Sequence, residues 1–179
     1  MGKLVRRGGR ERDALASLSL DSRSPLHAAK AQTTSVLERK QMGARELCNA
    51  AHGLASCKLG PEAPAWAAVW SALEVAYLAR LAEFTPQGLV ISAWAFATVG
   101  YESEALYATV RRRAISELPT FSPQGVSNTA WTFATAGHLS APLGCALAGE
   151  MAVRSPADFK PMELANVVWS FAKSGEYCL

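Results

Sequence analysis

One segment of this chain recurs at a nearly constant spacing. The sequences FTPQGLVISAWAFATVG, FSPQGVSNTAWTFATAG and FKPMELANVVWSFAKSG begin at Phe84, Phe121 and Phe159, so the copies start 37 and 38 residues apart. A period of this size is typical of stacked two-helix units, because one such unit cannot bury its apolar face alone. The repeat therefore predicts an extended binding surface rather than a single catalytic pocket.

Each copy carries the end signals of an α-helix. Thr85-Pro86 and Ser122-Pro123 fit an N-cap residue followed by the first helical residue. A glycine follows each apolar stretch, where helices end in a left-handed residue: Gly100, Gly137 and Gly175. A second helix is expected in each unit, over about 64–82, 102–118 and 142–153, from apolar residues at helical spacing. These signals predict an all-α fold, a right-handed α-solenoid of about 3.5 helical hairpins.

The array is expected to occupy residues 41–179. Its units span about 41–83, 84–120, 121–158 and 159–179, and the first is a degenerate copy in which Leu47 matches Leu164. The last unit is truncated, since its first helix has no second helix after it. An end of this kind leaves apolar residues partly uncovered, and it predicts that the chain belongs to a longer array or is capped by another chain. The residues concerned are Val167, Val168, Trp169 and Phe171.

Residues 1–40 have a different composition from the array. They hold nine Lys and Arg against four acids, a charge of +5, whereas the remaining residues hold nine against eleven, a charge of −2. Few apolar residues and no early periodicity predict a basic, mostly disordered segment with a helix over about 26–40. The Arg and Ser content is typical of an organelle transit peptide, while the acids favour a solvated tail or the remnant of an upstream repeat.

The first helices can be compared by position. We number each from the apolar residue it shares with the others, called position 0: Leu47, Leu89, Val126 and Leu164. Projected at about 100° per residue, positions 0, +4, +7 and +8 form an apolar core stripe. The tryptophans at +5 are expected to fill the groove between neighbouring hairpins, with base stacking as the alternative: Trp94, Trp131 and Trp169.

Small polar residues recur on the opposite face of the first helices. Their amides and hydroxyls can pair with a base edge or with a peptide backbone. One such set per unit is what a modular reader of single-stranded RNA requires, although the same side chains can also bond within their own helix. The candidate RNA-binding residues are Asn49, Asn128 and Asn166 at +2, Thr132 and Ser170 at +6, and Thr98, Thr135 and Lys173 at +9.

Catalytic and metal-binding patterns are missing from the sequence. The three histidines have no Ser, Cys or Asp at meaningful spacing, the four cysteines lack zinc spacing, and no phosphate-binding Gly-rich loop occurs. We therefore expect no enzyme activity, no cofactor and no metal. No apolar run approaches the roughly 18 residues that would span a bilayer, so no membrane partner is expected. The basic run Arg111–Arg113 is expected to be a solvated outer face.

The three repeated segments resemble the octotricopeptide repeats of algal organelle RNA-binding proteins. They are also similar to the helical repeats of about 37 residues in organellar proteins that carry FAST-kinase-like and RAP modules. The shared pattern, Pro-x-x-Leu-x-Asn-x-x-Trp-x-Phe-Ala followed by Gly, covers roughly residues 42–179, with Ile91 in place of one Asn and His52 in place of one Trp.

The resemblance implies an α-solenoid that binds single-stranded RNA without catalysis of its own. It implies action in the maturation, stability or translation of organelle transcripts, in the chloroplast or mitochondrion, with a cytoplasmic location as the alternative. Two other functions stay open. An armadillo-like solenoid would bind an extended peptide, which suits the charge of −2 on the array. A pure scaffold would bind no ligand.

Overall fold

The computed structural model describes residues 25–39 and 41–175, and within these ranges the regular structure is helical and contains no strand. The α-helices are α2 (Pro25–Glu38), α3 (Ala44–Ser56), α4 (Pro64–Ala79), α5 (Pro86–Thr98), α6 (Glu104–Glu117), α7 (Pro123–Thr135), α8 (Ala141–Val153) and α9 (Pro161–Ser174). Short 3₁₀ turns follow α4, α6 and α8, at Leu81–Glu83, Leu118–Thr120 and Pro156–Asp158. The all-α prediction is confirmed.

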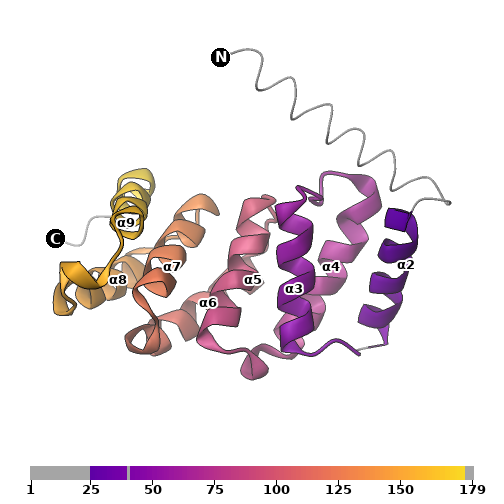
Figure 1. Cartoon of the computed structure of the whole chain (residues 1–179), viewed down its shortest axis with the longest axis horizontal. Coiled ribbons are helices and arrows are strands. Elements are labelled where there is room, and N and C mark those ends of the chain that lie inside the picture. Colours follow the sequence, from indigo (N-terminus) through magenta and orange to yellow (C-terminus); the bar gives the residue numbers. More distant parts are fainter. Residues whose placement is uncertain (1–24, 40, 176–179) are drawn as a thin grey trace, which may run out of the picture.

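The helices form two series that run along the long axis of the molecule. The first helices of the units pack in order, α3 against α5, α5 against α7 and α7 against α9. The second helices do the same, α4 against α6 and α6 against α8. Figure 1 shows this progression from α2 at one end to α8 and α9 at the other. Because neighbours in space are neighbours in sequence, each unit is covered by the next.

The helix expected over about 26–40 is α2. It packs against α4 and so precedes α4 in the series of second helices, which is the place a remnant of an upstream repeat would take. The rest of the expected disordered segment, residues 1–24, lies outside the described residues.

The predicted helix ends are confirmed. The Thr85 hydroxyl accepts a hydrogen bond from the Gly88 backbone N at 3.1 Å, and Ser122 caps Gly125 in the same way at 3.1 Å. In α9, where Lys160 takes the N-cap position, the Glu163 carboxylate instead accepts from the Lys160 backbone N at 2.8 Å. The three glycines after the first helices all have positive φ, of 66° at Gly100, 73° at Gly137 and 67° at Gly175.

Buried aromatic residues of the second helix α4 stabilise the packing around it. The stripe of α4 formed by Trp66, Trp70, Leu73 and Tyr77 is buried, and Trp70 Nε1 donates to the Leu59 carbonyl oxygen at 2.7 Å. Tyr77 reaches the next unit, where its hydroxyl donates to the Leu89 carbonyl oxygen at 3.2 Å. These bonds satisfy polar atoms of Trp70 and Tyr77 that burial would otherwise leave unpaired, whereas the buried Nε1 of Trp66 has no hydrogen-bond partner among the described residues.

The basic run of α6 is not simply a solvated face, contrary to the expectation. Arg113 pairs with Glu117, its Nε lying 2.8 Å from Oε1, and also donates to the carbonyl oxygens of Leu81 and Phe84. Arg154 at the end of α8 reaches back in the same way, donating to the Leu118 carbonyl oxygen at 3.4 Å. The ends of α6 and α8 thus each meet the 3₁₀ turn of the preceding unit, and an arginine there donates to its free carbonyl oxygens.

The last unit is open on one side, as the truncated repeat predicts. Val168 is 69% exposed and Trp169 44% exposed, and Phe171 is half-buried. Val167, in contrast, is buried. It occupies position +3, where the first helices pack against the preceding first helix, so α7 covers it even though nothing follows α9 within the described residues.

Candidate nucleic-acid interface

Only a narrow strip of each interior first helix reaches the surface. Such a helix contacts the preceding and the following first helix as well as its own second helix. From position 0, positions +5, +9 and +2 lie at about 140°, 180° and 200° around the helix, and position −2 lies at about 160°. We call the side chains at these four positions the ladder face.

The predicted asparagines lie on the ladder face. Asn49 is exposed, and Asn128 and Asn166 are half-buried. No hydrogen bond among the described residues uses the side-chain amide of any of the three. Each amide therefore offers donors and an acceptor to a ligand. The alternative, in which these side chains bond within their own helix, does not describe them.

The predicted residues at position +9 share this strip. Thr98 and Lys173 are exposed, while Thr135 is half-buried and its Oγ1 is buried without a hydrogen-bond partner among the described residues, so this hydroxyl is not open to a ligand. The structure therefore brings positions +2 and +9 to one surface, as the helical projection predicts.

Thr132 and Ser170 do not face a ligand, although the sequence placed them in the candidate site. Thr132 is 1% exposed and Ser170 is 0% exposed. Ser170 Oγ donates to the Asn166 carbonyl oxygen of its own helix at 2.6 Å, and Thr132 faces a small gap lined by Val90 and Ala93 of α5. Position +6 lies at about 240°, on the flank that the preceding first helix covers, so neither hydroxyl can reach a ligand.

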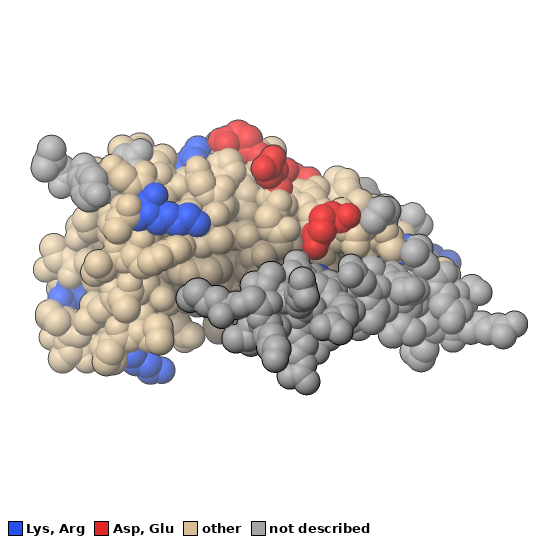
Figure 2. Space-filling view, turned by 90° about the horizontal axis from the view of Figure 1, so that it is seen from above, with Lys and Arg blue, Asp and Glu red and all other residues tan. Residues whose placement is uncertain are grey.

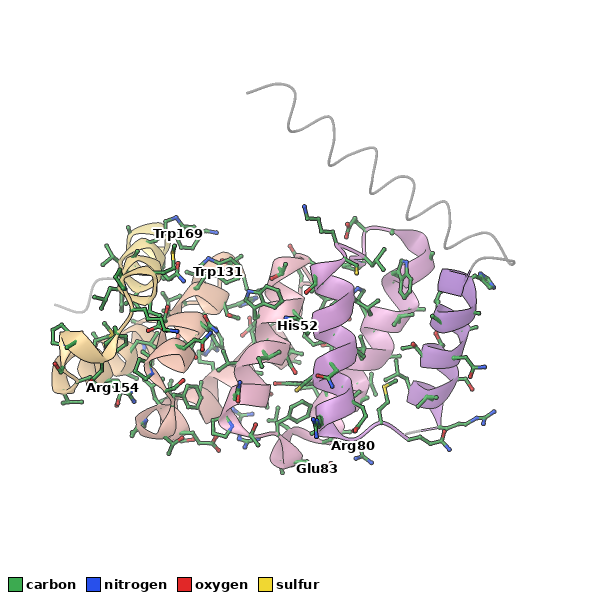
Figure 3. The ribbon with its side chains drawn as sticks, in the orientation of Figure 1. His52, Arg80, Glu83, Trp131, Arg154 and Trp169 are labelled. Carbon is green, nitrogen blue, oxygen red and sulfur yellow. The ribbon has the colours of Figure 1, made fainter. Side chains whose placement is uncertain are left out.

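The tryptophans at +5 lie between neighbouring first helices, as expected, but they are only partly buried. Trp94 and Trp131 are half-buried, and Trp169 is more exposed than either. The rings of Trp131 on α7 and Trp169 on α9 stack with centroids 6.5 Å apart. Both residues are labelled in Figure 3. His52, which replaces Trp on α3, lies 5.3 Å from Trp94 in the same manner. Their burial is incomplete because +5 lies at the edge of the exposed strip, at about 140°.

A groove on the ladder face separates α5 from α7. It has a volume of about 460 Å³, and the amides of Gln87, Gln124 and Asn128 line it together with Ile91. The two glutamines at position −2 were not predicted as site residues. Their recurrence in two copies at about 160° is the sequence signal that would have found them. A groove lined by uncharged amides can pair with base edges or with peptide groups.

Few cations accompany these amides. Arg45 at −2 and Lys173 at +9 are the basic residues at ladder positions, and Lys173 Nζ lies 4.9 Å from the centre of the Trp169 ring. Among the residues that Figure 2 colours, Lys and Arg are scattered over the face it draws. Within the described residues no group of His, Cys, Asp and Glu is placed to hold a metal ion. The site is therefore suited to hydrogen bonding and stacking more than to charge pairing.

Hydrogen bonds between neighbouring first helices fix how the positions of one first helix line up with those of the next. Cys48 Sγ, at position +1 of α3, lies 3.2 Å from Ser92 Oγ and donates to the Gly88 carbonyl oxygen at 3.3 Å. Burial raises the pKa of the Cys48 thiol, so it stays protonated and can donate. At the same position of α7, Ser127 Oγ donates to the Glu163 carbonyl oxygen at 3.0 Å. Position +1 of one unit thus meets positions −1 and +3 of the next.

Known families and proteins do not identify the chain. No protein-family model matches it, and a search of curated proteins finds no matching sequence. Among the described residues, none of the helices combines the length and the apolar character that crossing a membrane would need.

Proposed function

We propose that this chain is a right-handed α-solenoid that binds single-stranded RNA along its ladder face, without catalysis. RNA would lie across the first helices, with about one nucleotide per unit, and the protein would act in the processing, stability or translation of transcripts in a chloroplast or mitochondrion. The serial packing of α3, α5, α7 and α9 and the resemblance of the repeats to octotricopeptide repeats support this proposal.

The observation that carries the proposal is that partly exposed tryptophan rings at +5 and unpaired asparagine amides at +2 recur at the same positions of successive first helices. Asn128 and Trp131 on α7 are repeated by Asn166 and Trp169 on α9, one unit further along. A ring offers a stacking surface to any base, and an amide three residues earlier offers hydrogen bonds to that base's edge. A structural core would bury both groups and pair the amides.

The test is binding of the full chain to homopolymeric single-stranded RNA oligonucleotides, measured by fluorescence anisotropy over a range of salt concentrations. With about two cations on the ladder face, the slope of log K against log salt should be about −1 to −2. Asn128→Ala and Asn166→Ala should each weaken binding, and Thr132→Val should leave it unchanged. A much steeper slope, unaffected by the asparagine substitutions, would assign binding to the basic residues of 1–40 instead. No binding at low salt would refute the proposal.

A second function is favoured by the scarcity of cations at the ladder positions. An armadillo-like array could use the same asparagines to hold the backbone of an extended peptide, and this would need no phosphate contacts. The two functions separate in one competition experiment. If unlabelled unstructured polypeptide displaces labelled RNA from the chain while double-stranded RNA does not, the ladder face takes both ligands, and if peptide binds where RNA does not, the second function replaces the first.

A further inference from the structure

One side of α9 is exposed to solvent, although the equivalent side of each preceding first helix is buried against the next first helix. Positions +1, +4 and +8 of α9 are exposed: Ala165, Val168 and Ala172. The same positions are buried on α5, which α7 covers, and on α7, which α9 covers. Those residues are Val90, Ala93 and Ala97 on α5, and Ser127, Ala130 and Ala134 on α7. The repeat itself shows what kind of surface covers this side, namely the next first helix.

The complementary side is open on α3. Positions +3 and +6 are buried on α5, α7 and α9, where each faces the preceding first helix. On α3 the same positions hold Ala50, which is half-buried, and Gly53, which is exposed. Nothing lies within 4 Å of the place where a Cβ on Gly53 would be, so another helix can approach the backbone there closely. The exposed sides of α9 and α3 are thus the two surfaces that pack together wherever two first helices meet inside the chain.

We propose that two copies of this chain associate head to tail, with α9 of one copy packed against α3 of the next. This contact continues the interface that already joins α3 to α5, α5 to α7 and α7 to α9. It removes Val168, 69% exposed, from water, and it is heterologous, so it repeats and gives open chains rather than closed dimers.

The register of this contact follows from the contacts inside the chain. Cys48 at +1 meets Ser92 at +3 of the next unit, with 3.2 Å between the side-chain oxygen and sulfur. The equivalent pair between copies is Ala165 of one and Ala50 of the other. In the same register Trp169 of one copy adjoins His52 of the next, as His52 adjoins Trp94 within a copy. Association would therefore continue the ladder face from one copy to another.

The first test is sedimentation velocity of the full chain, without RNA, over a wide range of protein concentration. The weight-average mass should rise with concentration past that of a dimer. Val168→Glu should remove this rise, because it places a charge in an apolar contact. Val75→Glu is the control, since Val75 is a similarly exposed valine, at 66%, on the second helix α4 rather than on α3 or α9. A wild-type chain that stays monomeric throughout, or a rise that survives Val168→Glu, overturns the proposal.

The second test fixes the direction of the contact. In a Cys57→Ser background, which removes an exposed native thiol, Ala165→Cys and Ala50→Cys proteins are mixed and oxidised. A disulfide between the two variants is expected, and Ala165→Cys mixed with Ala105→Cys, an exposed site on α6, should give none. Cross-linking of Ala165→Cys to itself, in place of the mixed product, would show an isologous α9 contact and refute the head-to-tail arrangement.

Discussion

The indole rings of Trp131 and Trp169 stack across two successive first helices, with centroids 6.5 Å apart and planes 23° from parallel. The Lys173 ammonium lies 4.9 Å from the centre of the Trp169 ring. Trp169 keeps 44% of its surface in solvent, so this row of rings is not closed off by the fold. A planar base can extend such a row on its exposed surface.

Removing the Trp169 ring should weaken RNA binding more than it weakens the fold. Stacking of a base on an aromatic side chain contributes about 1–3 kcal/mol, so Trp169→Ala should lower affinity between about fivefold and 150-fold. Trp169→Phe, which keeps a ring, should recover most of the loss. Anisotropy titrations with single-stranded RNA measure both variants, and thermal melts provide the stability comparison. Equal affinity of Trp169→Ala and wild type would mean that the row of rings does not contact bases.

Two buried hydroxyls should respond in opposite ways to removal. Ser127 Oγ donates to the Glu163 carbonyl oxygen between α7 and α9, so Ser127→Ala should lower the free energy of unfolding by about 1–2 kcal/mol. Thr132 Oγ1 is buried without a hydrogen-bond partner among the described residues, so Thr132→Val should be neutral or stabilise by up to about 1 kcal/mol. Urea denaturation of the two variants checks the pair. A loss of stability in Thr132→Val would show that its hydroxyl has a partner, such as a bound water.

Replacing Arg113 should lower the free energy of unfolding, whereas replacing Arg112 should not. Its guanidinium satisfies the carbonyl oxygens of Leu81 and Phe84 and pairs with Glu117. Arg113→Met keeps much of the stem but leaves these acceptors unpaired, and it should cost about 1–3 kcal/mol of unfolding free energy. Arg112 is exposed, so Arg112→Met should change stability by less than about 0.5 kcal/mol. Equal effects of the two substitutions in urea denaturation would contradict the bonding described for Arg113.

The fold should lose stability in alkaline solution, in part through Tyr101. Burial first, and then the Glu74 carboxylate that accepts a hydrogen bond from the Tyr101 hydroxyl, raise the pKa of Tyr101 from 10.0 to about 12. Because the folded pKa is the higher one, this contribution is complete below pH 10 and is lost as the pH rises to about 12. Burial likewise raises the pKa of Tyr77 and Tyr107.

Absorbance titration of tyrosinate checks this prediction, alongside melts at several alkaline pH values. Tyr101→Phe should remove one phenol from the titration near pH 12 and make the decline of stability above pH 10 less steep. If Tyr101 titrates near pH 10 in the folded chain, the bond to Glu74 does not persist in solution.

Local signals predicted the helices well, because each depends on residues close in sequence. The capping hydroxyls of Thr85 and Ser122 and the left-handed Gly100 and Gly137 lie where the patterns placed them. The second helix expected over about 64–82 is α4, Pro64–Ala79. The candidate site was predicted less well. Asn128 faces the surface as projected, but Thr132, four residues later on the same side of a helical projection, does not.

The sequence by itself determined the all-helical units, their period, their end signals and the position of the amides at +2. The tertiary structure alone decided which side of each first helix stays exposed. A single helix with one apolar stripe would expose positions +6 and +9 together and bury Trp at +5. Packing between two neighbouring first helices covers a second flank, and it removes Thr132 and Ser170 from the surface while leaving Trp94, Trp131 and Trp169 partly exposed. The physical reason is that periodicity reports where apolar residues lie, whereas burial depends on how many neighbours a helix has.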